Sequence, residues 1–190
     1  MGSYFCRVET ARTILPATLA DAPALTELIN RAYRGEESRR GWTTEAHLFA
    51  GPRVRLEDVR MLAWNPSSKT AAEPTGALLK YLSTSNLLIG CVHLRPRGRR
   101  LYLSMLAVAP EAQAQGVGRK LLAHAEAYAR QHGCTRIKIT VLDARPELLA
   151  WYERHGYQRT GHSEPFPNTT DFGQPRQPLV LLELAKAVVA

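Results

Sequence analysis

The sequence of residues 108–120 is VAPEAQAQGVGRK, in which an apolar run ends, a short turn follows, and a long helix begins at two glycines, Gly116 and Gly118. Glycine has no Cβ, so the backbone at these positions can approach a ligand closely. The first N–H groups of a helix lack partners within the helix, and the helix dipole favours an anion there. Arg119 and Lys120 add two positive charges just inside the helix. Together these features predict a pyrophosphate-binding turn.

Two glycines at this spacing also occur where a helix simply packs tightly against a strand, so the pattern alone leaves that structural explanation open. Two other phosphate-binding motifs are excluded. A dinucleotide-binding fingerprint needs a third glycine at position 121, which is Leu121. A P-loop needs Gly-Lys followed by Ser or Thr, and this triplet occurs nowhere in the sequence.

The apolar pattern on both sides of the turn predicts an α/β fold. Three apolar runs precede it, separated by turn residues, which indicates an antiparallel meander. A strand–helix–strand–helix–strand pattern surrounds and follows it, which indicates a mixed sheet with helices on both faces. The predicted elements are strands over 13–17, 77–82, 87–94, 101–108, 136–142, 157–161 and 179–186, helices over 19–34, from 42 onwards, and over 56–64, 116–132 and 147–155, and loops over 36–41 and 65–75.

Length and composition are typical of one soluble globular domain. The chain has 190 residues, 45% of them hydrophobic and 22% charged, and a formal net charge of +8. Most of the basic surplus lies in residues 95–159, where twelve Lys and Arg residues stand against five acids. Such a surface suits a polyanion, either nucleic acid or a phosphate-bearing cofactor, although a merely solvated basic face has the same composition.

Targeting and redox signals are few. No run approaches the about 18 apolar residues of a membrane-spanning helix, and residues 1–10 lack the apolar centre of a signal peptide. The cysteines Cys6, Cys91 and Cys134 are odd in number and share no close spacing, which argues against a disulfide framework or a zinc site. We therefore expect a cytoplasmic protein with no membrane partner and no metal.

These motifs closely resemble the GNAT superfamily of acyl-CoA-dependent N-acetyltransferases. The family signature, Gln/Arg-x-x-Gly-x-Gly/Ala, is matched by Gln113, Gly116 and Gly118, and residues 105–110 resemble the strand that leads into that turn. The sequence WYERHGY at 151–157 resembles the family's aromatic-Tyr-Glu-x-x-Gly-aromatic helix end. The resemblance implies a GNAT-type sandwich, with a mixed, mostly antiparallel sheet of six to seven strands, helices on both faces, and a splay at the strand that ends near Val108. We expect a single domain over 1–190, with a cofactor-binding core at about 101–157 and acceptor-side elements at about 33–64 and 162–178.

The resemblance also implies acetyl-CoA as co-substrate. Its pantetheine arm would pair with the backbone of residues 106–108, and its pyrophosphate would bind main-chain N–H groups of the turn at 113–118. The phosphates of CoA would explain the basic surplus. Arg145 stands where relatives often carry Asn, so it either reaches a CoA phosphate or is an ordinary surface residue. The expected cofactor-binding residues are Leu106, Ala107, Val108, Gln113, Ala114, Gln115, Gly116, Val117, Gly118, Arg119, Lys120 and Arg145.

The resemblance makes Tyr152 the proton donor to the departing CoA thiolate, a role that suits a neutral phenol. The residues alone favour a core tyrosine, because Leu148 and Tyr152 share one helix face. An alkylamine acceptor with a pKa near 10 is only about one part in 10³ neutral at pH 7, a penalty of about 4 kcal/mol. Attack therefore needs a base, a water relay or a desolvating pocket. Many relatives place a Glu early on the pantetheine-pairing strand, but Tyr102 stands there.

Three residues could replace that base, and each could equally be structural or solvated. His93 has a suitable unperturbed pKa. It lies opposite Tyr102 if the turn at 97–98 has two residues, and the register slips by one if the turn has three. Glu36, or in its place Glu37, lies in the loop between the first two helices, and Glu164 precedes the last strand. The expected acceptor-site residues are Glu36, Glu37, Trp42, Tyr102 and Glu164, with Phe166 as an apolar flank.

We expect transfer of an acetyl group from acetyl-CoA to a primary amine by direct attack in a ternary complex, without metal or covalent intermediate. The acceptor would be a small molecule or a peptide, and a homodimer is compatible with the sequence. The alternative is a non-catalytic module that binds CoA or nucleic acid. Nucleic acid is the less favoured partner, because no recognition motif accompanies the basic residues.

Overall fold

The structure is a computed structural model that describes residues 13–63, 76–167 and 171–189. The strands are β1 (Thr13–Pro16), β2 (Phe49–Ala50), β3 (Ala77–Leu82), β4 (Leu88–Arg97), β5 (Arg100–Val108), β6 (Arg136–Leu142), β7 (Gln158–Pro165), β8 (Gln174–Pro175) and β9 (Val180–Ala187). The helices are α1 (Ala22–Tyr33), α2 (Gly35–Ser38), α3 (Leu56–Ala63), α4 (Val117–Gln131) and α5 (Pro146–Arg154), with 3-10 turns η1 (Leu19–Asp21) and η2 (Pro110–Ala112).

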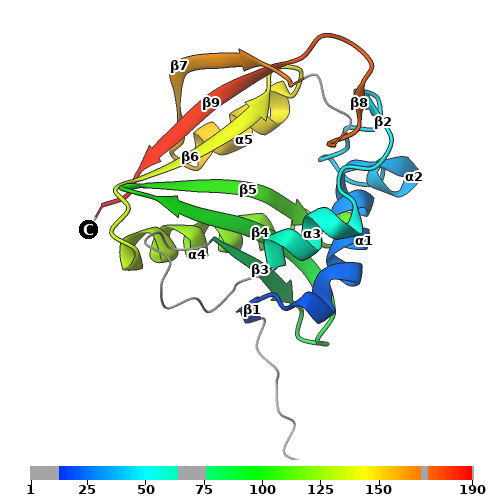
Figure 1. Ribbon diagram of the computed structural model, residues 1–190, viewed down its shortest axis with the longest axis horizontal. Coiled ribbons are helices and arrows are strands. Elements are labelled where there is room, and N and C mark those ends of the chain that lie inside the picture. Colours follow the sequence, from blue (N-terminus) through cyan, green and yellow to red (C-terminus); the bar gives the residue numbers. More distant parts are fainter. Residues whose placement is uncertain (1–12, 64–75, 168–170, 190) are drawn as a thin grey trace, which may run out of the picture.

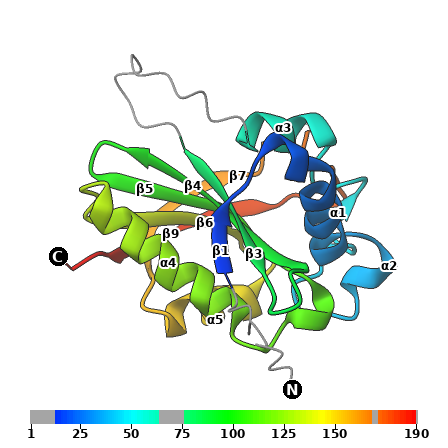
Figure 2. The ribbon, with the colours of Figure 1, turned by 90° about the horizontal axis from the view of Figure 1, so that it is seen from below.

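The main sheet has seven strands in the order β1-β3-β4-β5-β6-β9-β7, and β2 pairs separately with β8. Only β5 and β6 run parallel, so the sheet is mixed and mostly antiparallel. Helices α1 and α3 lie on one side of the sheet, and α4 and α5 lie on the other (Figure 2). The predicted fold class is confirmed.

The splay in the sheet follows from a single irregularity. Strand β5 pairs with β6 only from Arg100 to Tyr102, and beyond this point the two strands diverge (Figure 1). Near the same place the β4–β5 register shifts between Cys91 and His93, and Met105 on β5 has a φ of 51°. A bulge of this kind bends its strand and ends regular pairing. The divergence leaves space between β5 and β6 that side chains of both strands line.

Apolar helix faces form the core on each side of the sheet. Helix α1 buries Leu25, Leu28 and Ile29, and α4 buries Leu121 and Leu122, as their helical spacing predicts. Each such side chain contributes about 1.5–3 kcal/mol when it leaves water. The long helix α4 is thereby anchored on the sheet, which fixes the glycine-containing turn before it at the end of β5.

One predicted helix is wrong. Residues 42–43 and 46–48 form turns, residues 44–45 are irregular, and a short helix, α2, overlaps the predicted loop at 36–41. The reason is competition from groups outside the segment. Gln113 accepts a hydrogen bond from the Trp42 N–H, Arg145 donates to the Trp42 and Thr43 carbonyls, and Thr43 donates to the Ala32 carbonyl. These contacts occupy backbone groups that a helix would need for its own ladder.

Several boundaries also move. Strand β4 continues to Arg97, so the hairpin loop is Gly98–Arg99, one residue later than expected. The first helix begins as a 3-10 turn, and α1 starts at Ala22. Pro23 suits the first turn of α1, because an N–H there would have no partner within the helix and proline has none.

Within the described ranges, no helix is long and apolar enough to cross a membrane. Cys91 and Cys134 are free and buried. Cys6, the predicted loop at 65–75 and the predicted end of the helix at 64 lie outside the described residues.

Candidate functional site

Two cavities meet where β5 leaves β6. The splay cavity, of about 460 Å³, lies between β5 and β6 and is closed by residues of α1 and the loops around β2 and β8. The turn cavity, of about 850 Å³, is lined by residues 112–119 and by α5. The two cavities share Tyr33, Leu106, Leu148 and Tyr152. Two substrates, one in each cavity, could therefore meet at this junction.

The turn cavity contains the glycine-rich turn that the sequence singled out. Ala114 and Gly116 have left-handed φ angles of 60° and 77°, which turn the chain into α4. The first hydrogen bond of the helix runs from the Lys120 N–H to the Gly116 carbonyl at 3.1 Å. The N–H groups before it have no acceptor within the helix, so the turn presents unpaired donors at the positive end of a helix dipole.

Of the two basic residues at the start of α4, Arg119 lines the turn cavity and Lys120 does not. Residues 112–119, Arg119 included, line the cavity, whereas Lys120 is exposed and is not among the lining residues. A Cβ on Gly118 would lie 3.2 Å from the Trp151 ring, which forms part of the cavity wall. Glycine at 118 therefore lets Trp151 lie close to the helix start.

Gln113 holds a loop over the turn. Its Oε1 accepts from the Trp42 N–H at 2.9 Å, and its Nε2 donates to Thr43 Oγ1 and to the Val108 carbonyl. Trp42 lines the turn cavity, with its ring centroid 6.0 Å from that of Trp151. The prediction placed Trp42 at the acceptor site. In the structure it lines the turn cavity and not the splay cavity, because Gln113 draws the loop across the turn.

Two carbonyls of the predicted pantetheine-pairing strand already accept hydrogen bonds. The Tyr33 hydroxyl donates to the Leu106 carbonyl, and Gln113 donates to the Val108 carbonyl. Leu106 and Val108 line the turn cavity, whereas Ala107 is buried and pairs with Cys91 on β4. Tyr33 is thus a member of the site that sequence reasoning missed, since nothing in the sequence relates it to β5.

Tyr152 lies at the junction of the cavities. It is 7% exposed, and its ring makes edge contacts with Trp151 and Tyr157 at centroid distances of 4.9 and 5.3 Å. Burial and the nearby Tyr33 raise the pKa of Tyr152 well above its usual value. The phenol therefore stays neutral and can donate a proton or hydrogen bond to a group at the junction.

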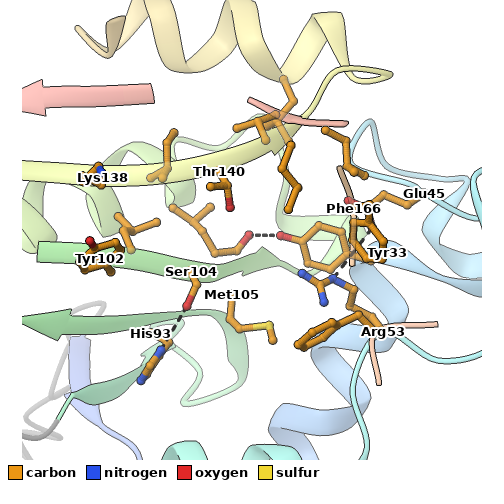
Figure 3. Close-up of a pocket in the computed structure, with 18 of the residues that line it drawn as sticks. Tyr33, Glu45, Arg53, His93, Tyr102, Ser104, Met105, Lys138, Thr140 and Phe166 are labelled. Carbon is orange, nitrogen blue, oxygen red and sulfur yellow. Dashed lines mark hydrogen bonds and ion pairs between the residues drawn. The ribbon is translucent and has the colours of Figure 1, made fainter. Parts of the chain in front are cut away.

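His93 does not lie opposite Tyr102. Because the hairpin loop is Gly98–Arg99, His93 pairs with Ser104 and Tyr102 pairs with Arg95. Both His93 and Tyr102 line the splay cavity, and His93 Nδ1 lies 3.1 Å from Ser104 Oγ (Figure 3). Burial, with a contribution from Arg95, lowers the pKa of His93 to about 4. The imidazole is neutral at pH 7 but is a weaker base than its unperturbed pKa suggested.

Replacing His93 by glutamine should reduce the acid sensitivity of folding. A histidine with a pKa lowered from about 6.5 to about 4 stabilises the fold fully above about pH 6.5, and this stability is lost as the pH falls toward 4. At about pH 5 the loss in the wild type is about 2 kcal/mol. The free energy of unfolding is measured in urea at about pH 7.5 and pH 5 for both proteins. Between these pH values it should fall by about 2 kcal/mol less in His93→Gln than in the wild type. If the two proteins differ in free energy of unfolding by the same amount at both pH values, then His93 is not a buried neutral imidazole.

Three predicted acids lie away from both cavities. Glu36 is exposed on α2 and pairs with Arg39 at 3.2 Å, and Glu37 pairs with Arg31. Glu164 is exposed on the edge strand β7. Because none lines either cavity, these positions do not suit a general base or a substrate ligand. Phe166 does line the splay cavity, where it makes an edge contact with Phe49 at 5.1 Å.

A buried carboxylate that the sequence did not reveal lies at one end of the splay cavity. Glu45 is 7% exposed and lies 2.5 Å from Arg34, 3.5 Å from Arg145 and 3.9 Å from Arg53. Arg34 lies 11 residues from Glu45 and Arg145 lies 100 residues away, and neither separation is a helix or strand spacing that would have paired them in the sequence.

Arg145 is 1% exposed and belongs to this cluster. Besides Glu45, its guanidinium contacts Glu147 and donates to the Trp42 and Thr43 carbonyls. A side chain buried in this way is neither a surface residue nor placed to reach a CoA phosphate. It instead ties the start of α5 to the loop that separates the cavities.

A second ion pair lies farther along the splay cavity. Lys138 on β6 pairs with Glu183 on β9, and the Lys138 Nζ lies 5.7 Å from the centre of the Tyr102 ring. Burial opposes ionisation of Glu183, but hydrogen bonds from Lys138 and Thr160 outweigh it and lower the pKa of Glu183. In Figure 3 Lys138 on β6 lies near Tyr102 on β5, and Tyr33, Glu45 and Arg53 lie toward the other end of the cavity. Ser104 points the other way, toward His93 on β4.

Comparisons with known proteins agree with this architecture. Residues 24–157 match the model of the acetyltransferase (GNAT) family. Acetyltransferase Atu2258 of Agrobacterium fabrum is 38% identical over 65 residues, a segment that covers 34% of this chain and 46% of that protein, so the match spans less than half of the curated relative's length.

Two solved structures share the fold. The ribosomal-protein-S18-alanine N-acetyltransferase of Escherichia coli has a TM-score of 0.66 and 17% identity, over 94% of this chain and 95% of that one. The PaiA N-acetyltransferase of Thermoplasma acidophilum, in complex with coenzyme A, has a TM-score of 0.64 and 16% identity, over 93% and 99% of the two chains. With a family model that matches most of its length and with this splayed sheet, the chain belongs to the GNAT family of acetyltransferases.

Proposed function

We propose that the protein transfers an acetyl group from acetyl-CoA to a primary amine by direct attack within a ternary complex. The observation that carries this proposal is the junction of the two cavities at Tyr33, Leu106, Leu148 and Tyr152. One cavity has the chemistry for a phosphate-bearing cofactor, and the other, which is lined by apolar and charged side chains, opens onto the same junction. A site that admits two substrates from two cavities suits a direct transfer.

The turn cavity fits acetyl-CoA. The unpaired N–H groups at the start of α4 and the side chains of Arg119 and Arg154 would bind phosphate oxygens. Trp42 and Trp151 offer apolar surface beside them. The fold relative from Thermoplasma acidophilum, which is in complex with coenzyme A, is consistent with this assignment.

In the proposed reaction the amine nitrogen forms a bond to the thioester carbonyl carbon, and the carbon–sulfur bond breaks. The sulfur leaves as a thiolate and takes a proton, and the nitrogen loses one. Tyr152 is the proposed proton donor to sulfur, because it lines both cavities at the junction and its hydroxyl stays neutral. The proton lost by the nitrogen would return to Tyr152 through solvent.

The amine must reach the junction in its neutral form. Among the described residues that line the splay cavity, neither carboxylate is a good base, since Glu45 is held by Arg34 and Glu183 by Lys138. His93, with a pKa lowered to about 4, is also weak. The positive side chains of the cavity disfavour an ammonium group, however, and so lower the pKa of a bound amine. We infer that this electrostatic environment, together with a water that accepts the proton, takes the place of a dedicated base.

Replacing Arg119 by glutamine should lower the affinity for acetyl-CoA about tenfold, because a charge-assisted hydrogen bond to phosphate is lost. Arg130→Gln is the matched control, since Arg130 is exposed on the same helix, α4, but lies outside the turn cavity. Both variants change the net charge equally. Isothermal titration with acetyl-CoA should therefore separate them, and equal losses of affinity would indicate general electrostatics in place of a local contact.

A thiol-release assay over a panel of amines tests the function itself. Turnover that depends on both acetyl-CoA and an amine is the expected result. Binding of acetyl-CoA without turnover on any amine would favour a non-catalytic CoA-binding module. Salt-dependent retention on DNA without stabilisation by acetyl-CoA would favour a nucleic-acid-binding module.

A further inference from the structure

The charges that line the splay cavity indicate the class of acceptor, an inference that rests on the proposed function. We propose that the acceptor resembles an amino acid, with a primary amine and an anionic group in one small molecule, and that Arg53 binds the anionic group. A carboxylate and a phosphonate share the required chemistry, and the experiment below distinguishes them.

The cavity carries more positive than negative charge. Four basic side chains line it, against the two carboxylates Glu45 and Glu183. The basic residues are Arg34, Arg53, Arg95 and Lys138. Like charges that share a low-dielectric site repel strongly. The cavity therefore disfavours a polycation such as a polyamine and favours an acceptor that brings a negative charge.

Arg53 is the basic group best placed to bind that charge. Arg34 is 7% exposed and is committed to Glu45 and to the Phe172 carbonyl, and Lys138 is committed to Glu183. Arg53, by contrast, has only a distant Glu45 oxygen at 3.9 Å, and a quarter of its side chain is exposed.

The guanidinium of Arg53 is also held in position. It lies 5.8 Å from the centre of the Tyr33 ring and 5.5 Å from that of the Phe172 ring. Asn30 Oδ1 accepts a hydrogen bond from the Arg53 backbone N–H at 2.7 Å. A planar guanidinium oriented by rings, with N–H donors to spare, matches the bidentate geometry of a carboxylate or a phosphonate.

Arg53 lies at the end of the splay cavity that leads to the junction. Tyr33 lines both cavities, and its hydroxyl donates to the Leu106 carbonyl at the junction. Arg53 lies beside the same ring, at the same end of the cavity (Figure 3). An anion on Arg53 would therefore lie at the end of the cavity that Tyr33 connects to the junction, so a small molecule that carries both an anion and an amine could contact Arg53 and reach the junction.

Pairing with Arg53 would also activate the amine. The carboxylate of a free amino acid stabilises its own ammonium group, because opposite charges attract. A guanidinium that neutralises the carboxylate removes this stabilisation, so the pKa of the amine falls and more of it is neutral near pH 7. The same contact would thus bind the acceptor and supply part of what a general base supplies elsewhere.

The experiment compares matched acceptors in a thiol-release assay with saturating acetyl-CoA. For each of several amino acids the panel includes the free acid, its carboxamide and its phosphonate analogue, with spermidine as the cationic reference. In the wild type we expect kcat/KM to be at least about tenfold higher for the acid or the phosphonate than for the carboxamide. The ratio of acid to phosphonate then identifies which anion the site prefers.

Arg53→Gln should reduce kcat/KM for the anionic acceptor about 10- to 100-fold and leave the carboxamide nearly unaffected, so the preference disappears. Arg53→Lys, which keeps the charge without the planar fork, should restore part of it. Arg55→Gln is the matched control, because Arg55 is exposed nearby and lies outside the cavity. Unchanged acetyl-CoA affinity in all variants shows that the fold and the turn cavity are intact.

Two results would overturn the inference and leave the proposed function standing. One is equal or better turnover of carboxamides or spermidine by the wild type. The other is an equal loss for acid and carboxamide in Arg53→Gln. If no amine accepts an acetyl group although acetyl-CoA binds, the proposed function fails, and the acceptor class fails with it.

Discussion

Replacing Tyr152 by phenylalanine should lower kcat by about 10²-fold or more and leave the affinity for acetyl-CoA nearly unchanged. The substitution removes only the hydroxyl, so the edge contacts of the ring with Trp151 and Tyr157 remain. The hydroxyl is the proposed proton donor to the thiolate, which must otherwise leave as an anion or take its proton from water. Turnover is measured by thiol release with an active amine, and affinity by calorimetry.

Tyr157→Phe is the matched control. Tyr157 is a second buried tyrosine, 5.3 Å from Tyr152 between ring centres, and its hydroxyl has no hydrogen-bond partner among the described residues. It lines neither cavity, so kcat should not change. Removing an unpaired buried hydroxyl should leave stability the same or raise it slightly. Full activity in Tyr152→Phe, or an equal loss in both variants, would show that the hydroxyl of Tyr152 is not the proton donor.

The fold could be predicted because its elements carry local signals. The helices α1 and α4 have apolar residues at helical spacing, β6 alternates, and Gly116 and Gly133 flank α4. Periodicity of this kind depends only on neighbouring residues. The order of the motifs then indicated the family. The helix predicted from residue 42 was wrong because contacts with the distant residues Gln113 and Arg145 outweigh the local preference of that segment for a helix.

In the candidate site, too, it was mainly residues contiguous in the sequence that could be predicted. The glycine turn is a continuous stretch, so its position in the turn cavity followed from the sequence. Tyr33 ends α1, whereas Glu45 and Arg53 lie in the loops before and after β2, and the three residues reach the splay cavity only through the fold. The acids chosen in their place, among them Glu36, were selected by their position in loops, and a loop position does not determine which way a side chain points.

Arg145→Met should lower the free energy of unfolding by about 3 kcal/mol. The guanidinium is buried between Glu45 and Glu147 and donates to the carbonyls of Trp42 and Thr43. Methionine fills much of the volume but satisfies none of these acceptors, and each buried polar group left unpaired costs about 1–3 kcal/mol. Arg31→Met is the control, because Arg31 forms only exposed ion pairs with Glu37 and Glu111, which contribute about 0–1 kcal/mol.

Arg145→Met should also weaken the binding of both substrates. A role of Arg145 in stability alone would not have this effect. Trp42 and Thr43 line the turn cavity and Glu45 lines the splay cavity, so one guanidinium holds a wall of each. We expect the Kd for acetyl-CoA and the KM for the acceptor to rise together in Arg145→Met, measured well below its melting temperature. If stability falls while both constants stay at their wild-type values, then Gln113 alone fixes the loop. In that case the separation of the two cavities depends on its hydrogen bonds to Trp42 and Thr43, and not on the buried charges beneath them.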